Sequence, residues 1–176
     1  MLALTIQNTN KSPVEVQRIM RTEYEKAMRE SVTFGEAQIA PRTPVGVTGH
    51  TRQGIVGKVI NPLHGEIGIQ GPASRYGEFV ESGRRPGKFP PSAAIELWLR
   101  RTDRGRRFVA SVKAKYGIKT NDAALKQATF LKQKGIGRRG TRGAFMFKES
   151  VNAIAADAQR NFQSAIVKIE KQVGDK

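Results

Sequence analysis

Two glutamates are the side chains of this sequence whose spacing best suits chemistry. Glu78 and Glu81 stand three positions apart on one predicted helix, a spacing that suits a shared proton or a metal ion. Arg84 and Arg85 follow at once, and cations beside carboxylates favour an ion pair or a contact surface instead. We therefore predict a binding surface here and expect the protein not to be an enzyme.

The other candidates for chemistry are isolated. Asp103, Asp122 and Asp157 have no histidine or serine partner in register. The chain has no cysteine, which excludes thiolate ligands, and its two histidines, His50 and His64, are too few for a histidine-based zinc site. We expect no catalytic residue, no metal and no cofactor.

A glycine pattern from Gly135 to Gly140 matches the dinucleotide-binding fingerprint letter for letter. That fingerprint requires a buried strand before it and an acidic residue about 20 positions later, within a parallel βαβ unit. Here a helical pattern precedes the glycines, and Arg138 and Arg139 fill the variable positions. We predict a mobile glycine- and arginine-rich loop over residues 135–143.

Positive charge is concentrated in the middle of the chain. The net charge is +16, and residues 82–142 hold 17 Lys and Arg against 3 Asp and Glu, a surplus of 14. Such a block predicts an anionic partner, either nucleic acid or an acidic protein surface, with a face kept for solubility as the alternative. No sequence-specific nucleic-acid module is visible, so only non-specific contact is expected. The candidate contacts are Arg100, Arg101, Arg104, Arg106, Arg107, Arg138, Arg139 and Arg142.

The stretch from residue 74 to residue 98 has the pattern of a docking elbow. Tyr76, Phe79 and Val80 recur at helical spacing, which predicts a short helix with one apolar face that Gly83 ends. An arginine-rich turn follows, and then a segment that its prolines keep extended. The predicted assembly surface consists of Arg84, Arg85, Lys88, Pro90 and Pro91.

A second helix completes the elbow. Ser92 is its candidate N-cap, and its apolar stripe includes Ile95, Trp98 and Leu99. Trp98 is the only tryptophan of the chain. Because large aromatic side chains on such a stripe usually pack inward, we expect Trp98 to be a core anchor rather than an interface residue.

A long helix is predicted near the N-terminus. Ser12 and Glu15 form a capping box with Pro13 at the first helical position, and apolar residues then recur at helical spacing to Ala40. The prolines that start at Pro41 end this helix.

The rest of the pattern predicts an α+β fold. Residues 55–61 and 66–70 alternate as the strands of an antiparallel hairpin, half buried on the first helix, and residues 147–173 form a long amphipathic helix. Residues 2–6 alternate as a brief edge strand. We thus expect long N- and C-terminal helices packed on a small antiparallel sheet, with short helices between them.

Length and composition favour one domain. The 176 residues, 38% of them hydrophobic, suit a single domain over residues 1–176. Within it we expect a basic, loop-rich and mobile insert at about 101–142. The insert contains one short helix that ends near Gly117 and a second that starts at Thr120 or Asn121. No apolar run is long enough to span a membrane, and the first residues do not form a signal peptide, so we expect synthesis in the cytoplasm.

This order of elements resembles the tail-completion, or neck (head–tail joining), proteins of tailed bacteriophages. The family pattern aromatic-small-x-x-Val-Glu-x-Gly maps onto Tyr76, Gly77, Val80, Glu81 and Gly83, and the proline-rich segment and Trp98 also match. Residues 48–52 resemble the family's Thr-Gly-x-Leu-Arg segment, with threonine in place of leucine, and residues 140–147 resemble its entry to the final helix. Residues 101–134 are the least similar part.

The resemblance implies a non-enzymatic structural protein of the virion. Such proteins assemble as rings, commonly of six subunits, at the head–tail junction, between head-completion or connector proteins and tail-terminator or tail-tube proteins. The implied location is the virion, with the host cytoplasm during assembly. The basic block would face an acidic neighbouring ring or the packaged DNA. Two alternatives remain: a tail terminator or other minor tail protein, and a non-specific nucleic-acid-binding protein.

Overall fold

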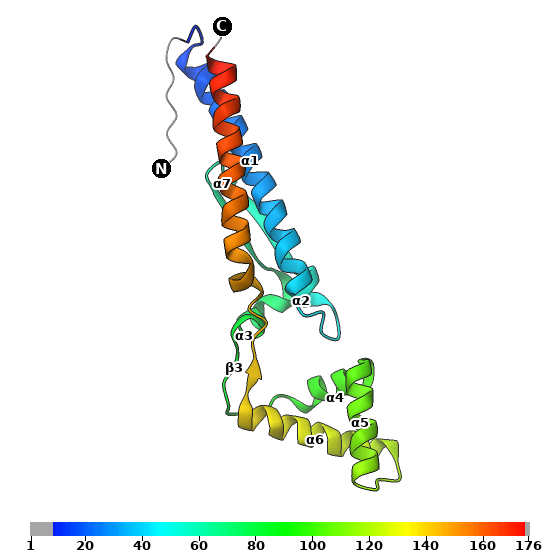
Figure 1. Ribbon diagram of the computed structural model, residues 1–176. Coiled ribbons are helices and arrows are strands. Elements are labelled where there is room, and N and C mark those ends of the chain that lie inside the picture. Colours follow the sequence, from blue (N-terminus) through cyan, green and yellow to red (C-terminus); the bar gives the residue numbers. More distant parts are fainter. Residues whose placement is uncertain (1–8, 175–176) are drawn as a thin grey trace. The chain divides into compact units, whose positions relative to one another are not determined.

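The computed structural model describes residues 9–174 and groups the chain into two compact units (Figure 1). The long-helix unit comprises Met1–Thr43, Arg52–Ser74 and Met146–Lys176. The basic unit comprises Pro44–Thr51 and Arg75–Phe145. Long terminal helices and a small antiparallel sheet confirm the predicted α+β class. The single domain over residues 1–176 stays a prediction, because contacts that group into two units do not test whether each folds alone.

Two antiparallel helices form the frame of the long-helix unit. They are α1 (Pro13–Arg42) and α7 (Met146–Val173), which lie side by side (Figure 1). The side-chain amide of Asn161 donates to the hydroxyl of Ser31 at 3.0 Å, and that of Gln172 donates to the carboxylate of Glu23 at 2.9 Å. Later residues of α7 thus contact earlier residues of α1. Both helices confirm the predicted patterns.

The ends of α1 follow from local chemistry. The Ser12 hydroxyl accepts the Glu15 backbone N–H at 3.3 Å, which confirms the predicted cap. The helix continues to Arg42, two residues beyond the predicted end, with Pro41 in its last turn. Thr43 closes the helix, because its backbone N–H and its hydroxyl both donate to the Ile39 carbonyl. These bonds satisfy acceptors at the helix end, so the proline does not stop the helix at once.

The predicted hairpin is present and lies on α1. Its strands are β1 (Ile55–Asn61) and β2 (His64–Ile69), so its turn is shorter than predicted. The Gly57 backbone N–H donates to the Glu36 carboxylate of α1. A Cβ on Gly57 would lie 2.2 Å from the Val32 side chain, so glycine allows the close approach. The strand predicted over residues 2–6 lies outside the described residues.

Short elements connect to the basic unit, whose three main helices share one core. The connecting elements are α2 (His50–Gln53) and the 3₁₀ turn η1 (Gly71–Arg75). The core cluster consists of Leu99, Val112, Leu125 and Ala128, and Trp98 packs partly buried against it. It joins α4 (Ser92–Arg101), α5 (Asp103–Lys115) and α6 (Asn121–Arg139).

The prediction of a loop-rich insert at 101–142 is wrong, because α5 and α6 occupy most of it. The hydroxyls of Thr102 and Thr120 cap these helices by accepting the backbone N–H groups of Gly105, at 3.0 Å, and Ala123, at 3.3 Å. The predicted helix start at Thr120 and the presence of helices within the insert are therefore confirmed, whereas its loop content is not. The cap at Thr102 was not predicted from the sequence.

The loop predicted over 135–143 is also wrong in its first half, since α6 continues to Arg139. A Cβ on Gly137 would lie 2.5 Å from the ring of Phe89. This glycine therefore serves close packing on a helix rather than loop flexibility. The helix ends at Gly140, whose φ of 71° is a left-handed conformation that glycine adopts readily.

No helix among residues 9–174 combines the length and apolar character needed to cross a membrane.

Candidate functional site

A two-stranded ribbon positions the predicted elbow. Short helix α3 (Gly77–Ser82) leads into β3 (Gly83–Arg84), which pairs antiparallel with β4 (Thr141–Arg142). The backbone N–H groups of Ala144 and Phe145 then donate to the carbonyls of Val80 and Glu81, at 2.8 and 3.0 Å. Residues 76–83, which carry the core of the phage resemblance, therefore meet residues 141–145, part of its later match, through their backbones.

Glycines make this ribbon possible. Gly83 has a φ of 85° and ends α3, as predicted. A Cβ on Gly140 would lie 1.9 Å from the Arg84 carbonyl oxygen, and one on Gly143 would lie 2.2 Å from that of Glu81. Side chains at these positions would push the two strands apart, so the glycines allow the close backbone pairing that follows α3.

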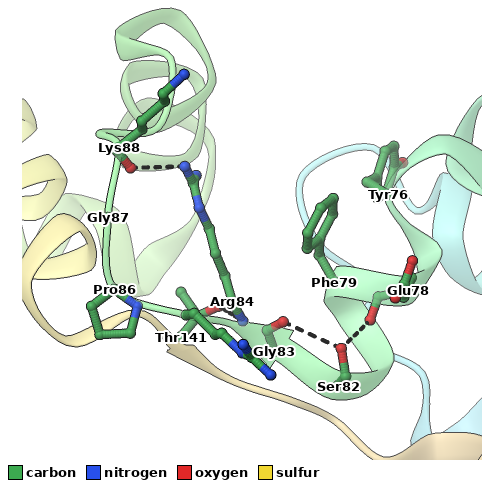
Figure 2. Close-up of a pocket in the computed structure, with 11 residues that line it drawn as sticks. Tyr76, Glu78, Phe79, Ser82, Gly83, Arg84, Pro86, Gly87, Lys88 and Thr141 are labelled. Atoms are coloured by element: carbon green, nitrogen blue, oxygen red, sulfur yellow. Dashed lines mark hydrogen bonds between the residues drawn. The ribbon is translucent and has the colours of Figure 1, made fainter.

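A groove lies between α3 and the turn that follows it, with a cavity volume of about 1150 Å³. Figure 2 shows Tyr76 and Phe79 on one side and the segment from Arg84 to Lys88 on the other. Tyr76 is 38% exposed and Phe79 is 57% exposed. The sequence correctly predicted the helix, but its apolar face does not pack inward as a whole. We call this site the aromatic groove; its lining residues are Tyr76, Glu78, Phe79, Ser82, Gly83, Arg84, Arg85, Pro86, Gly87, Lys88 and Thr141.

Arg84 shapes the aromatic groove. Its guanidinium donates to the Lys88 carbonyl at 2.7 Å, and its backbone N–H donates to the Thr141 hydroxyl at 3.1 Å (Figure 2). The side chain thus spans the turn. Arg85 and Lys88 are exposed and line the same groove. Of the predicted assembly residues, Arg84 therefore holds the turn, and Arg85 and Lys88 are available to a partner.

The two prolines of the predicted assembly surface are not among the residues that line the aromatic groove. The side-chain amide of Gln133 donates to the Pro90 carbonyl at 2.7 Å, and the Gly87 backbone N–H donates to the Gly137 carbonyl at 2.8 Å. Pro90 is half-buried and Pro91 is exposed. These two hydrogen bonds hold the extended segment of residues 87–90 against α6, so the segment that follows the groove has a fixed position on that helix.

The aromatic groove holds one carboxylate beside aromatic and cationic side chains. Glu78 lines it, whereas Glu81 is not among its lining residues, so the two carboxylates do not converge there. Among residues 9–174, no three His, Asp or Glu side chains are close enough to hold a metal ion together. Exposed aromatic rings beside cations suit a partner that offers apolar and acidic side chains.

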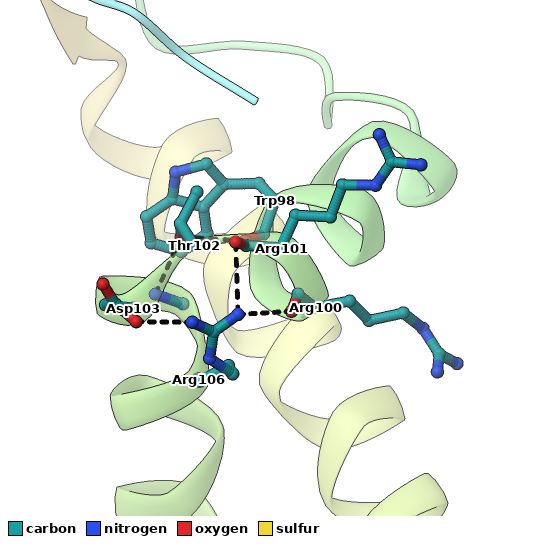
Figure 3. Close-up of polar contacts among 7 residues, drawn as sticks. Trp98, Arg100, Arg101, Thr102, Asp103 and Arg106 are labelled. Carbon is teal, nitrogen blue, oxygen red and sulfur yellow. Dashed lines mark hydrogen bonds and ion pairs between the residues drawn. The ribbon is translucent and has the colours of Figure 1, made fainter. Parts of the chain in front are cut away.

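The predicted basic contacts separate into two groups. Arg106 makes internal contacts: its guanidinium pairs with the Asp103 carboxylate and donates to the carbonyls of Arg100 and Arg101, at 3.2 Å each (Figure 3). It therefore joins the end of α4 to the start of α5. The side chains of Arg100 and Arg101 extend away from this cluster in Figure 3. Arg107 and Arg138 are exposed.

The remaining three predicted contacts, Arg104, Arg139 and Arg142, line a second cavity of about 530 Å³, which we call the cationic cavity. Lys132 lies among them, with its ammonium 5.1 Å from the ring centres of both Trp98 and Phe108. Burial, and then the charges of Arg104 and Arg139, lower the pKa of Lys132. The lining residues are Trp98, Arg104, Phe108, Leu131, Lys132, Gly135, Ile136, Arg139, Gly140, Thr141 and Arg142.

Sequence reasoning identified these arginines but missed Lys132 and Phe108. Lys132 stands outside the arginine-rich runs, and Phe108 reads as an ordinary apolar residue of a helix. Trp98, predicted as a core anchor, is partly buried against the helical core and also lines the cationic cavity. The role of each predicted contact residue stays a prediction.

Comparison with known proteins assigns no family. No protein-family model matches this sequence, and no curated protein and no solved structure is significantly similar to it.

Proposed function

We propose that the protein is a non-enzymatic structural component of a tailed-phage virion, a tail-completion or neck protein that joins head and tail. The resemblance of residues 76–83 and 140–147 to that family is the starting point. The aromatic groove is the single observation that carries the proposal, because it gives these segments a surface for docking.

The composition of the aromatic groove supports docking to a protein. Tyrosine, phenylalanine and arginine are enriched in protein interfaces, and the exposed rings of Tyr76 and Phe79 line the same groove as the exposed Arg85 and Lys88. The partner we propose is an acidic, partly apolar face of a neighbouring ring protein, on either the head or the tail side.

Assembly into a ring of identical copies is part of the proposal. Among the described residues the β1–β2 hairpin has only two strands, and two-stranded sheets are marginal alone. Contacts between copies of the chain would cover its open edges. We propose a homo-oligomeric ring, commonly six copies in the resembled family, located at the head–tail junction.

Charge reversal in the aromatic groove tests the joining role. In the phage or prophage that encodes the chain, Arg85→Glu with Lys88→Glu should yield complete heads and complete tails that remain separate in electron micrographs of the lysate. Arg84 is left unchanged because it holds the turn. The matched control, Lys115→Glu with Lys119→Glu, changes the charge equally at exposed positions outside the groove and should yield joined virions. Normal virions from the groove variant would contradict the proposal.

A further inference from the structure

Four cationic side chains from three elements converge on the cationic cavity. Arg104 comes from α5, Lys132 and Arg139 come from α6, and Arg142 comes from β4. No aspartate or glutamate lines the cavity. The convergence comes from packing, because these residues lie up to 38 positions apart in the chain.

The four side chains have no acidic partner within the part of the chain that the structure describes. The ion pairs found in the basic unit join Arg106 to Asp103 and Lys126 to Asp122, so two of its five carboxylates are paired with cations outside the cavity. Lys132 instead lies over the rings of Trp98 and Phe108. Like charges gathered without a counterion repel one another, and the lowered pKa of Lys132 has that repulsion as its second cause after burial.

We infer that the cationic cavity binds a phosphate group of a nucleic-acid backbone. Guanidinium groups offer forked donors that match the oxygens of a phosphate, and three of them surround this cavity from different elements. Apolar walls made by Trp98 and Phe108 lower the local dielectric, which strengthens attraction to an anion.

The surroundings of the cavity favour a polyanion over a single acidic side chain. The basic unit holds 18 Lys and Arg against 5 Asp and Glu, a surplus of 13. Arg100, Arg101, Arg107 and Arg138 are exposed on the same helices that line the cavity. These exposed cations give the helices a positive charge beyond the cavity, which favours a partner whose backbone carries a regular repeat of negative charge.

The rings in the cavity contact a cation of the chain itself. The Lys132 ammonium lies 5.1 Å from the centre of each ring, so it competes with a base for one face of the ring. Contact with phosphates alone carries no sequence information. The binding we infer is therefore independent of sequence and depends strongly on salt. It goes beyond the joining role, since a protein that binds no DNA can still join heads to tails.

Fluorescence anisotropy with the full chain and a labelled duplex DNA oligonucleotide of mixed sequence, over a series of NaCl concentrations, tests this inference. The cavity variant is Arg104→Gln with Arg139→Gln. The control, Lys115→Gln with Lys119→Gln, removes the same charge from exposed positions outside the cavity. We expect the cavity variant to lose about tenfold or more in affinity at low salt. Its slope of log affinity against log salt should be shallower than that of the wild type by about 1, because the contact to one phosphate is lost.

A second variant and a competitor make the outcome decisive. Arg142→Gln alone changes an exposed side chain on the two-residue strand β4, and should weaken binding while the circular dichroism spectrum stays that of the wild type. Inorganic phosphate should compete for the cavity, and polyglutamate should compete less well than unlabelled DNA. Equal losses in the cavity and control variants, no binding of DNA at low salt, or polyglutamate that binds the cavity as tightly as DNA would each overturn the inference.

Discussion

The two units of this protein differ in how their polar groups are used. The long-helix unit holds 13 Lys and Arg against 10 Asp and Glu, and its polar side chains pair across elements, as Asn161 does with Ser31 and Glu36 does with Gly57. The basic unit holds 18 against 5, and several of its cations face cavities without a counterion. Paired groups contribute to stability, whereas gathered like charges oppose it. We therefore propose that the long-helix unit is the structural frame and that the basic unit carries the binding surfaces.

The largest effect on stability is expected in the frame. Ile39 of α1 is 1% exposed, so Ile39→Ala should lower the free energy of unfolding by about 2–5 kcal/mol, through lost burial and the cavity left behind. Ile60→Ala is the matched control, because Ile60 is 54% exposed on β1. Urea unfolding followed by circular dichroism measures both. A similar loss in the two variants would show that the core does not lie where the structure has it.

The ribbon of the basic unit should be the next most sensitive feature. Gly140→Ala places a Cβ 1.9 Å from a backbone oxygen and also strains a φ of 71°. Gly117→Ala is the control, since its φ of 61° is strained in the same way but its Cβ would meet open space. We expect a loss of about 1 kcal/mol for Gly117→Ala and clearly more for Gly140→Ala. Hydrogen exchange should show faster exchange of the β3 and β4 amides only in the Gly140 variant. Equal exchange rates and equal stability losses in the two variants would contradict a structural role for the ribbon.

A smaller effect, of opposite sign, is expected at Lys132. Lys132→Met keeps most of the apolar stem and removes a charge that burial and two arginines oppose, so it should leave stability unchanged or raise it by less than about 1 kcal/mol. The same variant should bind DNA more weakly, as the phosphate inference requires. Thermal unfolding and fluorescence anisotropy measure the two effects. A variant that is clearly less stable would indicate that the charge is a structural element of the basic unit.

The pH dependence of Lys132 can be measured separately. Its pKa is lowered in the folded chain, so between that lowered pKa and the ordinary value of 10.5 the unfolded chain binds the proton more tightly. Stability of the wild type relative to Lys132→Met should therefore rise with pH across this window and stay constant below it. A difference that falls as pH rises would show that the pKa of Lys132 is raised instead.

The smallest effect is expected at Glu78. This carboxylate is the only acidic side chain among the residues that line the aromatic groove, so Glu78→Gln makes the groove more positive. Joining to an acidic partner should be retained, with virion yields like those of the wild type. A large loss of function in this isosteric variant would favour chemistry at the groove over docking.

Local signals in the sequence were enough to predict the frame. The cap at Ser12, the alternation in residues 55–61 and the apolar stripe of the last helix each depend on residues close in the chain, and the structure confirms all three elements. The prediction of a loop over residues 135–143 was wrong for residues 135–139, because Gly137 lies within α6 and allows it to pack closely on the ring of Phe89, 48 positions earlier in the chain. No local pattern records such a contact.

The candidate sites were only partly predictable for the same reason. The arginine-rich runs drew attention to Arg104 and Arg106 alike, although Arg106 pairs with Asp103 and Arg104 faces the cationic cavity. Phe79 has the spacing of a core residue, but α3 leaves it exposed beside the aromatic groove. Such roles depend on whether a side chain faces another element or solvent. Packing between segments that are distant in the chain determines this, and the local sequence does not record it.

The most direct test of the joining role is cryo-electron microscopy of virions of the phage or prophage that encodes this chain. We predict a ring of copies of this protein between head and tail, with Phe79 and Arg85 of the aromatic groove in contact with a neighbouring protein. Virions that lack the protein, or a ring in which the groove faces solvent, would contradict the proposed function.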